Sequence, residues 1–159
     1  LMLSSKNIID DQITLDDPRY LSKEQFEIEN KRTGIKPGDV LLTIVGTVGR
    51  CAVVPEIHPN ITLQRSVCVL HPIAEIIDSH FLFFELKCMQ DFIDSQAQGA
   101  AQRGIYLAQV GKLNIVVPSL SEQKAFVRLL QQSDKSKFEL KKAIDDINQL
   151  INSLIQQDT

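Results

Sequence analysis

The last quarter of the sequence is one long segment without any residue that breaks a helix. Neither glycine nor proline occurs between Ser119 and Thr159. Nine of its residues recur at alternating spacings of four and three, and seven of them are apolar: Phe126, Leu130, Ser133, Lys137, Leu140, Ile144, Ile147, Ile151 and Leu154. This heptad pattern is typical of a helix that packs against another helix. A helix of about 35 residues is roughly 50 Å long, and it needs such packing to be stable.

The start of this helix carries its own signal. Ser119 and Glu122 have the spacing of a capping box, in which the serine caps the helix and the glutamate bonds back to it. Ser121 is a competing cap. The apolar seam must pack against another surface. Two alternatives are possible: a second helix, or the chain's own preceding domain.

The preceding part of the chain has the pattern of a β-rich domain. A proline–glycine turn at 36–39 leads into an apolar strand at 40–45. Glycines bracket a tight loop at 46–49, and a second strand follows at 50–54, so we expect a hairpin. Another strand region spans 61–70. Residues 22–33 are polar and fit either a short helix or a loop.

Between 79 and 95 the period changes to that of a helix. Leu82, Leu86, Met89 and Ile93 share one face, with Asp78 as the expected N-cap and Gly99 after the end. The remaining expected elements are a polar loop at 96–104, one helical turn within 107–113 and a last strand at 114–117, which Pro118 closes.

These elements predict an α+β fold. We expect a β-rich domain with one or two packed helices at residues 1–118, followed by a single long helix of the coiled-coil type at 119–159. No apolar run reaches the roughly 18 residues of a membrane helix. The three cysteines form no Cys-x-x-Cys pair, which favours free thiols in a reducing compartment, and so a cytoplasmic protein.

The charge does not suggest a general polyanion binder, because the net charge is −3 and the pI about 5.6. Residues 31–66, however, hold five basic residues against two acidic ones. A local basic patch of this kind is compatible with DNA binding in an acidic chain.

Catalytic chemistry has little support in the sequence. None of the three histidines has a metal-ligand spacing to a cysteine or carboxylate, and the chain has no nucleophile-elbow motif. We therefore expect no catalytic residue, no metal and no cofactor. A small hydrolase that uses Ser66 or Cys51 with His58 or His71 is the enzyme alternative.

Recognition has better support, from two glycine-rich polar loops and one strand region. Arginine pairs bidentately with guanine and glutamine with adenine, while glycine lets a backbone approach phosphate closely. The expected DNA contacts are seven polar residues of these segments: Thr47, Arg50, Gln64, Arg65, Gln98, Gln102 and Arg103.

Four motifs, in order along the chain, resemble those of a known family. They are Gly-Asp-Val-Leu at 38–41 followed by Gly-Thr-Val-Gly-Arg at 46–50, Asn-Ile-Thr-Leu-Gln-Arg at 60–65, Gly-Ala-Ala-Gln at 99–102, and Val-Pro-Ser-Leu-Ser-Glu-Gln at 117–123. They resemble the target recognition domains of DNA specificity (S) subunits in type I restriction–modification systems. The resemblance covers about 36–157, and Ser119 stands where the family's junction motif has a second proline.

This resemblance implies a non-catalytic, sequence-specific DNA recognition subunit. Full S subunits hold two recognition domains apart with two antiparallel spacer helices, and they direct methyltransferase (M) and restriction (R) subunits to double-stranded DNA. This chain matches half of that plan, as a half-subunit or fragment, so we expect a homodimer. The residues expected on the pairing helix are Leu130, Leu140, Ile144, Ile147, Ile151 and Leu154.

A scaffold protein is the alternative from another functional class. It would use the β-rich domain for protein contacts and the long helix for assembly, without binding DNA. The acidic net charge favours this interpretation slightly.

Overall fold

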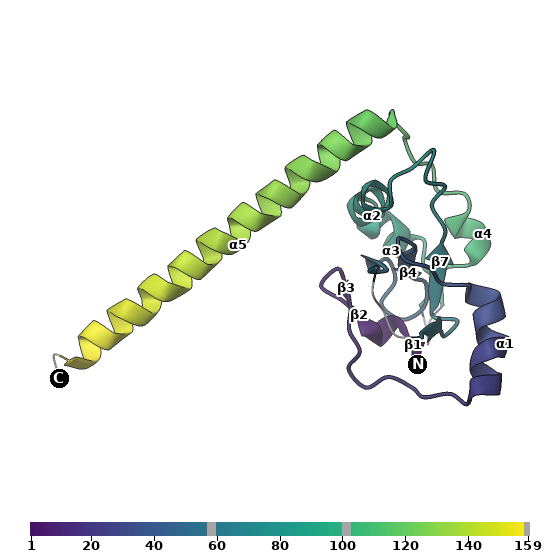
Figure 1. The fold of residues 1–159 in the computed structure, drawn as a ribbon, viewed down its shortest axis with the longest axis horizontal. Helices are drawn as coiled ribbons and strands as arrows, with labels where there is room; N and C mark the ends of the chain where they lie inside the picture. Colours follow the sequence, from purple (N-terminus) through teal and green to yellow (C-terminus); the bar gives the residue numbers. More distant parts are fainter. Residues whose placement is uncertain (57–59, 100–102, 158–159) are drawn as a thin grey trace. The chain divides into compact units, whose positions relative to one another are not determined.

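The computed structural model describes residues 1–56, 60–99 and 103–157. They form two compact units, Leu1–Gln123 and Lys124–Thr159. The elements, in chain order, are β1 (Met2–Leu3), η1 (Ser5–Asn7), β2 (Ile8–Ile9), β3 (Gln12–Ile13), α1 (Lys23–Thr33), β4 (Val40–Thr43), β5 (Cys51–Val53), β6 (Thr62–Leu63), β7 (Val67–Leu70), α2 (Ser79–Cys88), α3 (Gln90–Ser95), α4 (Leu107–Val110) and α5 (Leu120–Gln157) (Figure 1). The α+β fold predicted from the sequence is therefore confirmed.

The centre of the first unit is a three-stranded antiparallel sheet in the order β5-β4-β7. Two of its strands, β4 and β5, form the expected hairpin, in which Leu42 of β4 lies opposite Cys51 of β5. On the other side of β4, Thr43 lies opposite Val67. Strand β4 ends at Thr43, two residues earlier than expected.

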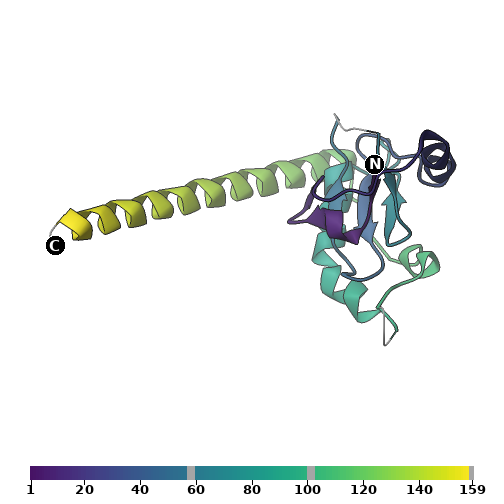
Figure 2. The same cartoon turned by 90° about the horizontal axis from the view of Figure 1, so that it is seen from below.

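Both faces of this sheet are covered. On one face, Val40 and Leu42 pack in a core with Leu82 and Leu86 of α2. On the other, Leu41 belongs to a second core with Leu3 and Leu63. Alternate residues of β4 thus enter opposite cores, as the two-residue period of a strand requires. Figures 1 and 2 show α1 and α2 on opposite sides of the sheet.

Two minor pairings complete the unit. Strand β1 pairs in parallel with β6, and β2 pairs with β3 as a hairpin whose tip, Asp10 and Asp11, has positive φ. Helix α1 ends against β6, where the buried hydroxyls of Thr33 and Thr62 lie 3.0 Å apart. Residues 22–33, left open between helix and loop, are thus mostly helical.

Two expectations need correction. The helix expected at 79–95 is divided at Met89 into α2 and α3, although Asp78 caps its start as predicted. The strand expected at 114–117 is wrong: these residues pair with no strand in the described chain, and Val116 is exposed. Apolar β-branched residues favour a strand only where a neighbouring strand is available.

The beginning of α5 follows the predicted capping box. The backbone N–H of Ser119 donates to Glu122 Oε2 at 3.0 Å, and the N–H of Glu122 donates to Ser119 Oγ at 3.4 Å. The next residue, Gln123, is fully buried. Its amide accepts from the N–H of Asp78 and donates to the carbonyls of Ile76 and Pro118. The first turn of α5 is therefore held by the first unit.

Candidate nucleic-acid interface

Two of the polar segments predicted to bind DNA lie at one edge of the three-stranded sheet. Because β4 is antiparallel to β5 and β7, the end of β4 at Thr43 lies beside the starts of β5 and β7. The 44–50 loop, which carries Thr47 and Arg50, therefore shares an edge with residues 64–66, which include Gln64 and Arg65.

Backbone hydrogen bonds bring the third segment to the same edge. Val45 forms an isolated bridge with Gly104, and the N–H of Gly46 donates to the Arg103 carbonyl at 2.9 Å. The N–H of Ile44 donates in turn to the Ser66 carbonyl at 2.8 Å. Loops from three separate parts of the sequence are thus joined through their backbones.

A buried threonine fixes the 44–50 loop from beneath. Thr43 is fully buried, and its hydroxyl accepts from the N–H of Arg50 at 2.9 Å. The same hydroxyl lies in a short contact with the Thr47 carbonyl, to which it donates. Thr43 was predicted only as part of a strand, because nothing in its sequence neighbours distinguishes it from an ordinary strand threonine.

Close packing explains one glycine of the third segment. A Cβ at Gly104 would lie 3.0 Å from the Ile44 carbonyl oxygen and 3.2 Å from Val45 Cγ2. Since Cβ atoms rarely approach backbone oxygens so closely, a larger residue would push the third segment away from the sheet edge.

The predicted arginine side chains differ in their exposure and in the partners that hold them. Arg65 is exposed, and no hydrogen bond or ion pair holds its guanidinium within the described chain. Arg103 is exposed but paired, with Nη2 2.9 Å from the Asp94 carbonyl oxygen and 3.2 Å from Asp94 Oδ2. Arg50 is half-buried, and its Nη1 donates to the Ile8 carbonyl at 3.4 Å.

The other four predicted residues are Thr47, Gln64, Gln98 and Gln102. Thr47 and Gln98 are exposed, whereas Gln64 is half-buried. The backbone of Gln98 exchanges two hydrogen bonds with Gly104, and the N–H of Gln64 donates to the Leu3 carbonyl. Gln102 lies outside the described residues.

A cleft of about 750 Å³ lies between this edge and the end of α1. Of the predicted residues that the structure describes, Arg65 and Gln98 line it. Arg32 and Tyr106 also line it, and Tyr106 is 72 % exposed. Neither residue was predicted from the sequence, although an exposed tyrosine beside arginines is a common feature of nucleic-acid sites. The guanidinium of Arg32 is partly occupied, because it bonds the Leu63 carbonyl and Glu29.

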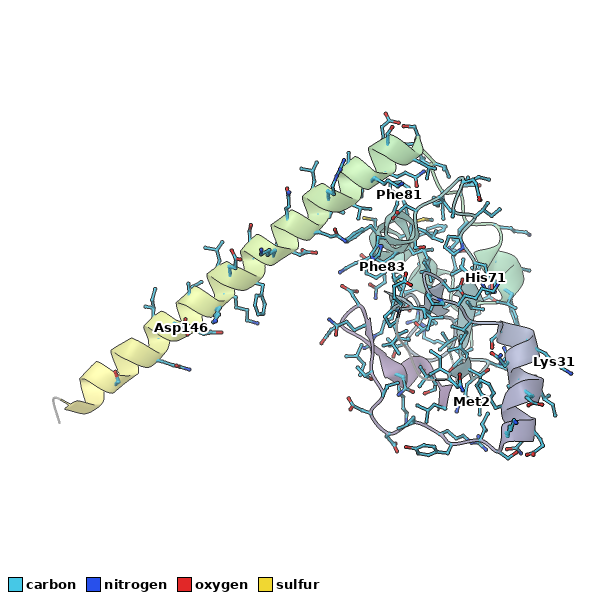
Figure 3. All side chains as sticks on the ribbon, viewed as in Figure 1. Met2, Lys31, His71, Phe81, Phe83 and Asp146 are labelled. Carbon is cyan, nitrogen blue, oxygen red and sulfur yellow. The ribbon has the colours of Figure 1, made fainter. Side chains whose placement is uncertain are left out.

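Among the described residues, the hydrolase alternative finds no geometric support. Ser66 precedes β7 and His71 follows it, so about 16 Å of extended strand separates them. His71 instead pairs with the buried carboxylate of Asp39, at 2.9 Å; Figure 3 labels this histidine. Burial raises the pKa of the Cys51 thiol to about 12 and that of Cys68 to about 11, so neither thiol is a ready nucleophile. His58 lies outside the described residues.

Within the described chain, no group of three or more histidine, cysteine or acidic residues is arranged to hold a metal ion. The helices of the same residues include none that is both long and apolar enough to cross a bilayer.

A family model matches residues 9–150, and its description is "Type I restriction modification DNA specificity domain". The chain belongs to this family. The match includes the sheet, the three joined loops and most of α5.

Individual proteins show the same likeness. The type I restriction enzyme EcoBI specificity subunit of Escherichia coli is 28 % identical over 155 residues, which cover 94 % of this chain and 32 % of that subunit. The HsdS subunit from Thermoanaerobacter tengcongensis has a TM-score of 0.60 at 20 % identity, over 89 % of this chain and 31 % of that one. The S subunit from M. genitalium has a TM-score of 0.51 at 22 % identity, over 63 % and 26 %. The chain thus spans about a third of the length of the curated relative.

The specificity domain also presents an apolar seam on α5. Leu140, Ile144 and Ile147 are 65 %, 58 % and 54 % exposed, and Leu130 is half-buried. Ile151 and Leu154, also predicted on this seam, have side chains outside the described part of the helix. An exposed aliphatic surface of this kind is typical of a contact surface.

Proposed function

We propose that this chain recognises a specific sequence in double-stranded DNA as the non-catalytic recognition part of a type I restriction–modification enzyme. The observation that carries the proposal is the joined set of loops at the edge of the β5-β4-β7 sheet, in a chain that belongs to the specificity-domain family. These loops place exposed guanidinium and amide groups on a backbone that hydrogen bonds hold in place.

Within this set, the residues divide by their freedom to contact DNA. Arg65, Gln98 and Thr47 are exposed and are the first candidates for base contacts. Arg103 is paired with Asp94, and Arg50 is held towards the Ile8 carbonyl. We assign both to phosphate contacts, which position the protein on the duplex. Gln64 and Gln102 complete the proposed set.

The proposal divides the chain at the start of α5. Residues 1–118 read the DNA, while 119–159 form a spacer that pairs with a second helix and docks methyltransferase subunits, which restriction subunits then join. Support for pairing comes from the exposed seam, which includes Leu140 and Ile144. A homodimer would present two recognition units to a symmetric site. The free thiols of Cys51 and Cys68 suit a reducing location, the cytoplasm.

The proposal is tested by selection from a random duplex pool. The chain, with the methyltransferase subunit of its own system, is mixed with the pool, and the bound DNA is separated by mobility shift and sequenced. We expect enrichment of one motif, with an affinity that falls as salt rises because phosphate contacts release counterions. A pool that stays random at every salt concentration would instead favour the non-DNA-binding scaffold.

The variant Arg65→Ala tests whether Arg65 contacts a base or a phosphate. If Arg65 reads a base, the variant accepts every base at one position, at a cost of about 1–3 kcal/mol for the preferred site. If it holds a phosphate, affinity falls equally for all sequences and the salt slope decreases by about one. Arg128→Ala, which removes the same charge from α5, is the matched control and leaves the motif unchanged.

A further inference from the structure

The cleft of about 750 Å³ between the sheet edge and the end of α1 has an apolar floor. The buried side chains of Ile44, Val67 and Ile105 line it. Figures 1 and 2 show the two flanking helices, α1 and α4, on the same side of β7. Of the described residues that line the cleft, none is acidic, whereas two are arginines. The lining therefore suits a ligand that is apolar in one part and negatively charged in another.

Three side chains of the cleft are exposed and unoccupied. Within the described residues, no hydrogen bond, ion pair or ring contact holds the side chain of Arg65, Gln98 or Tyr106. Their backbones, in contrast, are held in place. The N–H of Tyr106 donates to Gln109 Oε1 at 2.8 Å, and two backbone hydrogen bonds, of 2.9 and 3.0 Å, hold Gln98. Arg65 lies in a turn, 64–67, that a 3.1 Å backbone hydrogen bond closes. Free side chains on a fixed backbone are the arrangement of a preorganised binding site.

Arg32 supplies a second cation from the end of α1. Its Nη2 donates to the Leu63 carbonyl and to Glu29 Oε2, the latter at 3.2 Å. Its Nη1 donates to no other group in the described chain. The pair with Glu29 is exposed, and pairs of this kind are weak. Arg32 can therefore bind a phosphate without leaving its anchor on the Leu63 carbonyl.

A nucleotide outside the base stack matches this lining best. In an intact duplex the faces of the bases are covered by their neighbours, and only base edges are open in the grooves. Proteins that take a base out of the stack hold it against aromatic and apolar side chains and bond its edge. Sites for unstacked strands also combine aromatic side chains with a cationic groove. Tyr106, Gln98 and Arg65 provide an aromatic face, an amide and a cation around one apolar floor.

We propose that the cleft receives one unstacked nucleotide of the target DNA, with Tyr106 stacked on its base, Gln98 bonded to its edge and Arg65 on its phosphate. Arg32 faces the same strand from α1. This inference rests on the proposed recognition of DNA, and it adds a pocket and two contact residues, Tyr106 and Arg32. Taking a base out of the stack costs free energy, and the cost is smallest where the base is already mismatched.

Mismatched duplexes test whether a base leaves the stack. The motif is first defined by selection from the random pool with the methyltransferase subunit. Each base pair of the motif is then replaced by a mismatch, first keeping the base of one strand and then that of the other. At one position, a mismatch that keeps the inserted base should raise affinity about tenfold, because this base no longer has to be unpaired. If no mismatched duplex binds more tightly than the intact motif, the proposal is wrong.

The variant Tyr106→Ser tests whether this cleft holds the base, because a methyltransferase subunit can also take a base out of the stack. Serine is a good N-cap residue, so α4 should begin as in the wild type. We expect affinity for the intact motif to fall about tenfold and the gain from the mismatch to shrink to less than about twofold. Tyr106→Phe keeps the ring and should preserve both values.

Tyr20→Ser is the matched control. Tyr20 is 77 % exposed and does not line the cleft, so neither the affinity nor the gain from the mismatch should change. A mismatch gain of full size in Tyr106→Ser would place the unstacked base elsewhere and overturn the proposal. DNA recognition itself is judged separately by the selection. A pool that stays random overturns both proposals, whereas a selected motif without any mismatch gain overturns only the unstacked nucleotide.

Discussion

In the Leu1–Gln123 unit, apolar residues of a short sheet lie buried on both faces, whereas on α5 aliphatic residues of similar size remain open to solvent. Leu42 in β4 is fully buried, and Leu140 on α5 is 65 % exposed. The first unit closes its cores with its own helices and with pairings between distant parts of its sequence. The helix instead leaves apolar side chains of its heptad pattern exposed in the described residues. The first unit therefore buries its apolar residues within itself, whereas α5 presents an apolar surface that we propose a second helix covers.

The largest expected change in stability comes from truncating a buried leucine of the sheet, compared with an exposed leucine of α5. Leu42→Ala should lower the free energy of unfolding of the first unit by about 3 kcal/mol, because it leaves a cavity between β4 and α2. Leu140→Ala should leave that free energy within about 0.5 kcal/mol of the wild-type value and should weaken only self-association. Native-state amide exchange at β4 measures the first quantity, and sedimentation measures the second. An equal loss of protection in β4 for both variants would show that the helix supports the sheet.

The residue where the two regions join comes next. Gln123→Leu should cost about 2 kcal/mol, because the buried N–H of Asp78 and the carbonyls of Ile76 and Pro118 lose their partner. Gln132→Leu, on the exposed part of α5, is the matched control and should change unfolding by less than about 0.5 kcal/mol. Urea unfolding followed by circular dichroism compares the two variants. Similar midpoints would mean that water replaces the lost partner of these backbone groups.

The sequence predicted local features of both regions. The hairpin of β4 and β5, the Asp78 cap and the Ser119–Glu122 capping box each depend on residues close in sequence, and the structure contains them. The parallel pairing of β1 with β6 was not predicted, because strands of two residues have no readable period and Met2 meets Thr62 only in the folded chain.

Some residues of the candidate site were likewise predicted from the sequence, and others were not. Residue type and loop position suggested Arg65 and Gln98, which the structure places along one cleft. The same reasoning did not find Arg32 or Tyr106, because α1 and the start of α4 reach that cleft only through the tertiary fold. The ion pair between Arg103 and Asp94 was not predicted either, since the two residues come from different elements.

The buried thiols should make the stability of the first unit depend on pH. Desolvation raises the pKa of Cys51 in the folded chain to about 12, from 9.0. Above pH 9 the unfolded chain therefore loses a proton that the folded chain keeps, and stability falls as pH rises towards 12. Between about pH 9.5 and 11, Cys51→Ala should remove roughly 1 kcal/mol per pH unit from this slope. Unfolding of both proteins across this range tests the point, and parallel curves would show that Cys51 does not contribute to it.

The smallest expected change in stability should have a clear effect on binding. Asp94→Asn removes an exposed carboxylate from Arg103 but keeps the Asp94 carbonyl that also accepts from its guanidinium. Exposed ion pairs contribute about 1 kcal/mol or less, so unfolding should hardly change. The freed charge of Arg103 should increase affinity for duplex DNA severalfold at low salt, and high salt should remove most of the gain. Asp91→Asn, from the same helix, makes the same change in net charge at a residue that forms no ion pair in the described chain. If both variants gain equally, net charge alone explains the increase. If only Asp94→Asn gains, Asp94 holds Arg103 away from the DNA until a target competes for it.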